Sequence, residues 1–316
     1  MQHFLSVKDA IDVQALVKEA LLYKKAPYAD KHIGKNRTMG LLFFNSSLRT
    51  RLSTQRAAQN LGLELIVMNV GQDGWGLEFE DGAIMNGNKA EHIKEAAPVV
   101  GQYCDIVGIR SFPGLVDREE DYSEKVLNQF VKHTGRPIVS LESATRHPLQ
   151  SLADLITIEE LKTKPRPKVV LTWAPHVKAL PQAVPNSFAE WMNAADVDFV
   201  ITHPEGYELA PEFVGNAKVT YNQKEAFEGA DFIYAKNWSS YNQYGQILNQ
   251  DPAWMVTMDK MKLTNNAKFM HCLPVRRNVI VADEVIDSPN SVVIEQANNR
   301  TYSAQLVLQK ILENVK

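Results

Sequence analysis

Short runs of β-branched and apolar residues alternate with longer amphipathic stretches along the whole 316-residue chain. This alternation predicts an α/β fold built on parallel sheets. The runs expected to form strands cover residues 38–45, 64–70, 105–110, 137–142, 168–173, 198–202, 218–221, 232–235, 268–273 and 291–294. Ligands of such sheets bind beyond the carboxyl ends of the strands, so functional residues are expected there.

Two helices have recognisable start signals, and a third is indicated by its apolar face. Pro148 fits a first helical position, and the residues after it are apolar at helical spacing. Ser187 and Glu190 have the spacing of a capping box at the start of another helix. The last helix is expected from about residue 298, with Val315 near the end of its apolar face.

Composition narrows the class of protein. The net charge of −3 offers no basic field for nucleic acid, and no apolar run approaches the roughly 20 residues of a membrane span. Hydrophobic residues make up 45% of the chain, which argues against intrinsic disorder. The start of the chain lacks the pattern of a signal peptide, and its two cysteines suggest a reducing compartment. A cytoplasmic protein of two domains of about 150 residues is expected, and the charged, proline-rich residues 162–167 suggest a boundary.

A first candidate site follows the first expected strand. Ser47, Leu48, Arg49 and Thr50 stand where a strand leads into a helix. Free N–H groups and the helix dipole favour an anion there, and hydroxyl and guanidinium groups add donors. A plain helix N-cap with solvated arginines is the alternative.

A second candidate site lies between another strand and a helix. His147 and Gln150 are three residues apart at the expected helix start, so both can face one ligand atom. The alternative is that His147 merely caps the helix.

A third candidate site lies at the end of a later strand. Cys272 and Leu273 precede a proline, and the paired Arg276 and Arg277 follow. A small core residue is the alternative for Cys272, whereas two adjacent arginines suggest an anionic ligand.

Further polar residues fall at or just after strand ends: Arg110, Glu142, His176, His203 and Lys236. Each one alone is more typical of a surface or structural residue. Together, on one edge of the predicted sheets, they indicate a site for a phosphate and a carboxylate-bearing molecule.

Several chemistries have no support in the sequence. No Gly-x-Gly-x-x-Gly or Gly-x-x-x-x-Gly-Lys-Ser/Thr motif indicates nucleotide binding. No His-Glu-x-x-His or Cys-x-x-Cys cluster indicates a metal, and no Gly-x-Ser-x-Gly elbow indicates a serine hydrolase. We therefore expect neither a cofactor nor a metal.

The three candidate sites together resemble the motifs of the carbamoyltransferase family. Residues 47–51 are similar to its Ser-x-Arg-Thr-Arg motif for carbamoyl phosphate. Residues 147–154 resemble its His-Pro-x-Gln-x-Leu-Ala-Asp segment, and residues 271–274 the His-Cys-Leu-Pro of the ornithine-type branch. The order and spacing match over essentially the whole chain.

One departure indicates the branch of the family. Ornithine enzymes carry a Ser-Met-Gly loop where this chain reads Ala-Lys-Asn-Trp from Ala235. That stretch resembles the acylornithine carbamoyltransferases of arginine biosynthesis. A cation at Lys236 suits a substrate whose α-amine is a neutral amide and whose carboxylate is free.

The acyl group is indicated by two further positions. The acetyl branch tends to carry an acid where this chain has Ala90, and a lysine where it has Ile280. A small neutral residue leaves room for a longer acyl tail and does not repel its carboxylate, with which Arg276 would pair. N-succinylornithine is therefore the expected acceptor, N-acetylornithine the alternative, and free ornithine the third candidate. Proline is usual at this position in the succinyl branch, so the match is incomplete.

The resemblance also implies roles for the residues. Ser47, Leu48, Arg49 and Thr50, with Arg110 and Arg300, would bind the phosphate. The carbamoyl group would contact His147, Gln150, Cys272 and Leu273, with Arg49, His147, Gln150 and Cys272 catalytic. The acylornithine would contact Glu142, His176, Lys236, Arg276 and Ala90. Trp75 would bind carbamoyl phosphate in a neighbouring subunit's site, unless it only packs at a subunit contact.

The implied architecture has two domains, each with a parallel sheet flanked by helices and joined by a long helix. Residues 1–150 would bind carbamoyl phosphate and residues 151–316 the acylornithine, with the C-terminal helix (about 298–316) returning to the first domain. The family is trimeric, so a homotrimer with shared sites is expected. A catalytically silent, anion-binding regulatory paralogue is the alternative from another class, and intact Arg49, His147, Gln150 and Cys272 argue against it.

Overall fold

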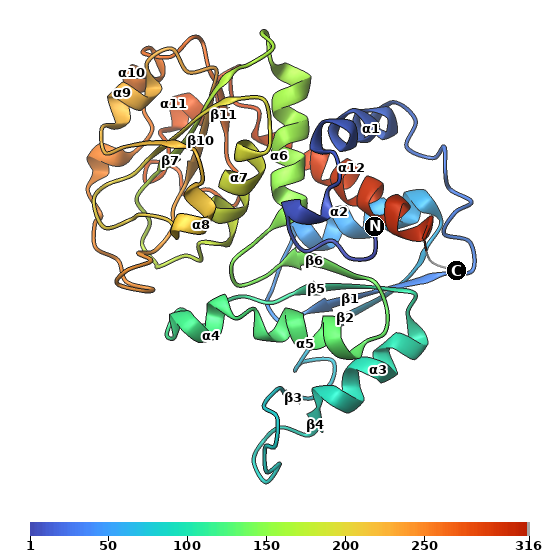
Figure 1. Ribbon diagram of the computed structural model, residues 1–316. Helices are drawn as coiled ribbons and strands as arrows, with labels where there is room; N and C mark the ends of the chain where they lie inside the picture. The colour runs from blue at the N-terminus through green and yellow to red at the C-terminus, as the bar shows by residue number, and fades with distance from the viewer. Residues whose placement is uncertain (315–316) are drawn as a thin grey trace. The chain divides into compact units, whose positions relative to one another are not determined.

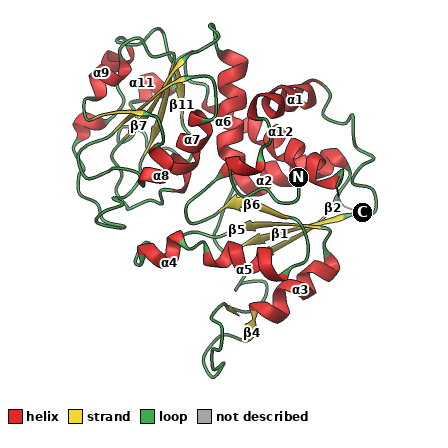
Figure 2. Cartoon of the chain, in the orientation of Figure 1, coloured by secondary structure: helices red, strands yellow, loops and turns green. Residues whose placement is uncertain are grey.

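The computed structural model describes residues 1–314, and the chain in it forms two compact units (Figure 1). The first unit comprises residues 1–114, 119–149 and the chain from Arg300 onward. The second comprises residues 115–118 and 150–299. Each unit is an α/β structure with helices along both faces of a parallel sheet, which confirms the expected fold class (Figure 2).

The first unit is built on a four-stranded parallel sheet in the order β2-β1-β5-β6. Its strands are β1 (Thr38–Phe43), β2 (Glu64–Asn69), β5 (Ile106–Arg110) and β6 (Ile138–Glu142). Its helices are α1 (Val13–Lys25), α2 (Arg49–Leu61), α3 (Ile93–Tyr103), α4 (Arg118–Tyr122) and α5 (Lys125–His133), with a 3₁₀ turn at Val7–Asp9. Strands β5 and β6 are buried along their whole length, as expected of parallel strands covered on both faces.

The second unit is built on a five-stranded parallel sheet in the order β11-β10-β7-β8-β9. Its strands are β7 (Lys168–Trp173), β8 (Asp198–Thr202), β9 (Lys218–Thr220), β10 (Phe232–Lys236) and β11 (Lys268–Met270). Its helices are α7 (Ala183–Asn193), α8 (Pro211–Val214), α9 (Gln223–Phe227), α10 (Met258–Met261) and α11 (Asp283–Ile286), with a 3₁₀ turn at Pro252–Trp254. Its core contains Ile233, Phe227 and Phe269.

Two helices belong partly to each unit. Helix α6 (Pro148–Leu161) begins in the first unit, and from Gln150 it belongs to the second. Helix α12 (Val293–Leu312) begins in the second unit, and from Arg300 it packs with the first. Pro148 is the first residue of α6, as expected. The proline-rich residues 162–167, suggested as a domain boundary, lie inside the second compact unit.

Nine of the expected strands are present within a few residues of the expected bounds, and one expectation is wrong. Residues 291–294 do not form a strand, because α12 already begins at Val293. Only Ser291 makes an isolated bridge, to Phe269. Val293 and Ile294 are the first two residues of a 20-residue helix, so their local strand preference does not decide the structure here. The last helix thus starts earlier than residue 298, and Val315 lies outside the described residues.

Two other local expectations are corrected. Helix α7 begins at Ala183, so Ser187 and Glu190 lie inside it and form no capping box at its start. Strand β11 ends at Met270 rather than continuing to Leu273. The short strands β3 (Leu77–Glu78) and β4 (Glu91–His92) were not expected; they pair with each other outside the main sheet. Among residues 1–314, no helix is long and apolar enough to cross a membrane.

Candidate active site

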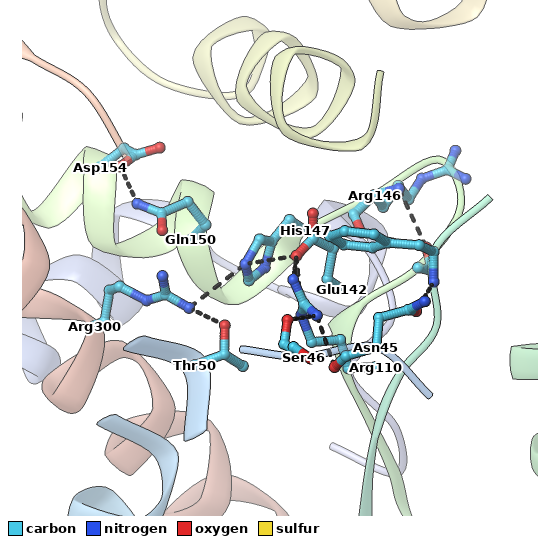
Figure 3. A network of polar contacts seen from close by, with 12 residues as sticks. Asn45, Ser46, Thr50, Arg110, Glu142, Arg146, His147, Gln150, Asp154 and Arg300 are labelled. Carbon is cyan, nitrogen blue, oxygen red and sulfur yellow. Dashed lines mark hydrogen bonds and ion pairs between the residues drawn. The ribbon is translucent and has the colours of Figure 1, made fainter. Parts of the chain in front are cut away.

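Arg110 organises the carboxyl end of the first sheet (Figure 3). It is the last residue of β5 and is buried, and its Nε and Nη2 atoms each lie 3.2 Å from Oε2 of buried Glu142. Its Nη1 donates to the carbonyl oxygens of Asn45 (2.9 Å) and Ser46 (2.6 Å). Arg110 thereby holds the segment that connects β1 to α2.

The start of α2 is open to an anion. The helix begins at Arg49, and its N-cap residue Leu48 makes no side-chain hydrogen bond to the first turn. Ser47 and Arg49 are half-buried, whereas Leu48 is exposed. N–H groups of a first turn that no side chain caps, together with the helix dipole, favour a negatively charged ligand.

Arg300 lies beside this helix start although it is far away in the sequence. It belongs to the part of α12 that packs with the first unit, and it is buried. Its Nη2 donates a short hydrogen bond to Thr50 Oγ1 and lies 3.5 Å from His147 Nε2 (Figure 3). The structure therefore brings together three of the residues assigned to carbamoyl phosphate.

His147 is buried and neutral. Burial lowers the pKa of its imidazole well below the usual range, and the Arg300 and Arg110 guanidinium groups lower this pKa further. The Arg300 guanidinium, which can only donate, lies nearer to Nε2 (3.5 Å) than the Glu142 carboxylate does (3.7 Å), so we assign the tautomer in which Nε2 accepts and Nδ1 carries the proton. Nδ1 is buried and has no hydrogen-bond partner among the described residues. An N–H group is thus available to a ligand oxygen.

This neutral histidine predicts an acid sensitivity of folding. An unfolded histidine has a pKa of about 6.5, so below that pH only the unfolded chain gains a proton at residue 147. The lowered pKa of folded His147 therefore contributes stability that is present above about pH 6.5 and lost as the pH falls toward the folded value. Chemical denaturation at pH 7.5 and 5.5 measures the effect.

We expect His147→Asn to reduce the loss of unfolding free energy between these two pH values by about 1 kcal/mol. The exposed residue His32, changed to Asn, is the control and leaves the loss nearly unchanged. An equal loss in the wild type and in His147→Asn would contradict a neutral, buried His147.

In the second unit, a chain of hydrogen bonds links Gln150 to the segment after β11. Gln150 Nε2 and Gln296 Nε2 each donate to Asp154 Oδ1 at 2.7 Å. Gln296 Oε1 accepts from His271 N (2.9 Å), and His271 Nδ1 accepts from Leu273 N (2.8 Å). This network orients the Gln150 amide and the backbone around Leu273.

One feature of this network suits an amino-group ligand, and another marks a strained backbone. Gln150 Oε1 is buried and has no hydrogen-bond partner within residues 1–314. Leu273 has a φ of 55°, a left-handed conformation that is costly for a leucine and is retained mainly where the surroundings enforce it. Cys272, just before it, is half-buried and is not part of a disulfide.

The second unit also gathers three of the residues assigned to the acylornithine. Arg276 Nε donates to His176 Nε2 at 3.1 Å. Burial lowers the pKa of His176, and the charges of Lys236 and Arg276 act in the same direction. Lys236 is the last residue of β10 and is buried. Positive charge is thus concentrated here, and none of these three residues carries a carboxylate.

The two adjacent arginines, Arg276 and Arg277, make different contacts. Arg277 donates to Asp287 with both Nη atoms (2.7 Å each) and to Asp283 (2.9 Å), so its guanidinium is engaged in surface ion pairs. Arg276 faces His176 instead. The sequence left this choice open, and the geometry favours Arg276 as the ligand-binding arginine.

Trp75 and Ala90 lie apart from these clusters, on the segment that contains β3 and β4. The segment bonds to itself: Trp75 Nε1 donates to Glu91 Oε2 (2.7 Å), and Ala90 N donates to Gly76 O (3.2 Å). Trp75 and Ala90 are both exposed. In Figure 1 this segment projects from the first unit, away from the helices α1 and α2.

Some polar residues of these networks were not predicted. Asp154 follows Gln150 by four residues on α6, a spacing that brings side chains together, so it could have been found from the sequence. Gln296 and His271 meet through the tertiary fold, and no local pattern indicates it. His203 lies after β8 with its ring near Tyr221 and Trp238, a structural packing role. Within residues 1–314, no three His, Cys, Asp or Glu side chains gather as metal ligands would.

Comparisons with known proteins agree in sequence and in structure. The carbamoyl-P binding domain of the aspartate/ornithine carbamoyltransferases matches residues 2–160, and their Asp/Orn binding domain matches residues 181–311. The N-succinylornithine carbamoyltransferase of Bacteroides thetaiotaomicron is 60% identical over 318 residues, covering 100% of both chains. The N-acetylornithine carbamoyltransferase of Xanthomonas campestris pv. campestris is 35% identical, covering 99% of this chain and 98% of the relative.

Solved structures of N-acetyl-L-ornithine transcarbamylase share the fold. One variant, with a glutamate replaced by serine, is complexed with carbamyl phosphate and N-succinyl-L-norvaline; its TM-score is 0.93 at 34% identity. Another, with a lysine replaced by alanine, is complexed with PALAO and has a TM-score of 0.92. Each match covers 98% of this chain and 100% of the other.

Proposed function

Because the chain belongs to the aspartate/ornithine carbamoyltransferase family, we propose that it carbamoylates the δ-amine of N-succinyl-L-ornithine. Carbamoyl phosphate is the donor, and N-succinyl-L-citrulline and phosphate are the products. The observation that supports carbamoyl phosphate as the donor is that Thr50, Arg300 and His147 lie together beside the uncapped start of α2. The acceptor half is supported by the relatives of 60% identity, which are named for N-succinylornithine.

The phosphate is assigned to the start of α2 and its surroundings. Ser47, Leu48, Arg49 and Thr50 would supply backbone and side-chain donors, and Arg300 a buried guanidinium. Arg110 would bind the phosphate together with these residues. It also holds the preceding segment through the Asn45 and Ser46 carbonyls. As phosphate leaves, its growing charge meets these fixed donors and positive charges.

The carbamoyl group is assigned to complementary donors and acceptors. His147, with a protonated Nδ1, would donate to the carbonyl oxygen and so polarise the carbon. Gln150 Oε1 and the backbone carbonyls of Cys272 and Leu273 would accept from the amino group. The neutral δ-amine attacks the carbon, a C–N bond forms, and the C–O bond to phosphate breaks. The amine loses one proton, which the departing phosphate can take, and no covalent enzyme intermediate is needed.

The acylornithine is assigned to the cationic cluster of the second unit. Lys236 would bind the α-carboxylate, and Arg276, held by His176, would pair with the carboxylate of the succinyl tail. Glu142 is also proposed as an acylornithine contact, although its Oε2 already pairs with Arg110. Ala90, small and neutral, would leave space for the tail. Complexes of the acetylornithine relative with N-succinyl-L-norvaline, obtained after replacement of one glutamate, support this assignment.

The assembly and setting follow from the family resemblance. We propose a homotrimer in which Trp75 and Ala90, on the projecting segment, serve the site of a neighbouring subunit. The two units would be the carbamoyl phosphate-binding domain (1–150) and the acylornithine-binding domain (151–316), with the C-terminal helix returning to the first. A cytoplasmic role in arginine biosynthesis without cofactor or metal completes the proposal.

Carbamoyl transfer to three acceptors tests the function. Initial rates with N-succinyl-L-ornithine, N-acetyl-L-ornithine and L-ornithine, each with carbamoyl phosphate, give three values of kcat/KM. We expect the succinyl compound to exceed the acetyl compound at least tenfold, because only its second carboxylate can pair with Arg276.

The other outcomes of this assay are equally informative. A preference for the acetyl compound would make N-acetylornithine, the substrate named for the relatives of 35% identity, the acceptor. No turnover of any of the three acceptors would contradict carbamoyl transfer and favour an anion-binding regulatory protein. The buried polar groups of His147 and Gln150 argue against that alternative, because binding an anion alone does not require them.

A further inference from the structure

Glu124, to which nothing above assigns a role, binds the loop of the first unit that precedes His147. Its Oε1 accepts from Ser143 Oγ (2.6 Å), from Thr145 N (2.8 Å) and, in a short hydrogen bond, from Thr145 Oγ1. Its Oε2 accepts from Ala144 N at 3.2 Å. One carboxylate thus takes four donors from three consecutive residues.

The loop depends on this carboxylate. Its own bonds, Ser143 N to Arg146 O (2.7 Å) and Arg146 N to Ser143 Oγ (3.1 Å), close a small turn but leave the amides of Ala144 and Thr145 to Glu124. Ser143 and Thr145 are buried, so donors that lost Glu124 would lose a partner away from water. The carboxylate is therefore the main anchor of residues 143–145.

The backbone of Glu124 is adapted to this contact. The residue precedes α5 with φ 53° and ψ 35°, the left-handed region that a residue with a Cβ atom rarely adopts. The Glu124 side chain makes no cap bond to its own helix and is directed to the loop instead. Backbone conformations of this kind are found preferentially near functional sites.

The loop lies directly between two candidate site residues. Glu142 ends β6, where it pairs with Arg110, and His147 follows residue 146. Among residues 1–314, the polar contacts of the His147 ring are long, 3.5 Å to Arg300 and 3.7 Å to Glu142. Because no short side-chain bond from these residues holds the imidazole, its position depends on the backbone that leads to it.

We infer that Glu124 is a positioning residue for carbamoyl transfer: by holding residues 143–145 it sets the place of the His147 ring. The inference rests on the proposed function. Glu124 itself touches neither substrate. Its loss therefore slows the step in which His147 polarises the carbamoyl group and leaves phosphate binding, which is assigned to α2 and Arg300, nearly unchanged.

Two variants and a matched control test the inference. Glu124→Ala removes all four bonds, whereas Glu124→Gln keeps the shape but turns an –NH₂ group toward a backbone or hydroxyl donor. Glu119→Ala removes an exposed acid of neighbouring α4. For each protein, kcat and KM for both substrates, the Kd of inorganic phosphate and hydrogen exchange of peptides covering residues 143–146 are measured.

We expect Glu124→Ala to lower kcat at least tenfold, with the phosphate Kd within threefold of the wild type and exchange of the 143–146 peptides at least tenfold faster. The kcat and the peptide exchange rate of Glu124→Gln should lie between those of Glu124→Ala and the wild type. Both quantities should be the same in Glu119→Ala as in the wild type. A smaller loss of kcat, unchanged exchange, or a phosphate Kd that weakens as much as kcat overturns the inference.

Two further outcomes are separable. If Glu124→Ala does not fold, Glu124→Gln decides alone, and a loss of kcat below threefold overturns the inference. If the wild type transfers no carbamoyl group, the proposed function fails and the catalytic part of the inference fails with it. In that case unchanged exchange in Glu124→Gln would show in addition that the carboxylate does not hold the loop.

Discussion

Arg49→Ala is expected to lower kcat/KM for carbamoyl phosphate by a factor of about 10²–10³, equivalent to about 2.7–4 kcal/mol of transition-state stabilisation. Arg49 is the first residue of α2, where the backbone N–H groups have no side-chain cap and Arg300 approaches Thr50. Under the proposed assignment, removing the guanidinium takes away a charge-assisted donor to the phosphate, on which negative charge grows as it departs. The measurement is the initial rate at saturating acceptor over a range of carbamoyl phosphate concentrations.

Arg56→Ala is the matched control for this variant. Arg56 lies on the same helix, is exposed, and donates Nη2 to Tyr28 Oη at 2.5 Å. Its loss should change kcat/KM less than twofold. Arg49→Lys should recover only part of the activity, because an ammonium group cannot bind phosphate in the bidentate geometry of a guanidinium. Activity of Arg49→Ala within tenfold of the wild type would show that the phosphate assignment is wrong.

Ala90→Glu is expected to lower kcat/KM for N-succinyl-L-ornithine at least 100-fold and to change that for N-acetyl-L-ornithine less than fivefold. Two carboxylates about 4–6 Å apart repel each other by about 3–4 kcal/mol at an effective dielectric constant near 20, which is enough for such a loss. The acetyl group carries no charge and is shorter, so it escapes both the repulsion and the clash. The measurement is kcat/KM for both acceptors with the wild type and the variant.

The control for Ala90→Glu separates charge from size. Ala90→Gln adds nearly the same volume without charge, so the difference between the two variants measures the repulsion. Ala90 is exposed and its backbone N donates to Gly76 O, a bond that either substitution retains. Higher ionic strength should restore part of the activity of the Glu variant and none of that of the Gln variant. An equal loss for both acceptors would contradict the role of Ala90.

Much of the fold was predictable because buried parallel strands have a recognisable pattern in the local sequence. Strands β7 and β8 occupy the expected residues, since an unbroken β-branched and apolar run bounded by polar residues suits a strand covered on both faces. Residues 291–294 show the limit of this reasoning. The same local preference is present there, but Val293 and Ile294 belong to the 20-residue helix α12.

The site was predictable to the extent that strand ends and motifs reveal it. Arg110, Glu142 and Lys236 do end β5, β6 and β10. Their functional roles stay predictions. The sequence could not distinguish Arg276 from Arg277, because both neighbours look alike until Asp283 and Asp287 are found beside Arg277 alone.

The sequence by itself determined the alternation of strands and helices, the family and the residues at the strand ends, because each depends on neighbours within a few positions. Only the tertiary structure decided which distant side chains meet. Arg300 reaches Thr50 across 250 residues, and Glu124 reaches a loop some 20 residues away. Such contacts are set by the packing of whole helices and sheets, which no local pattern of residues encodes.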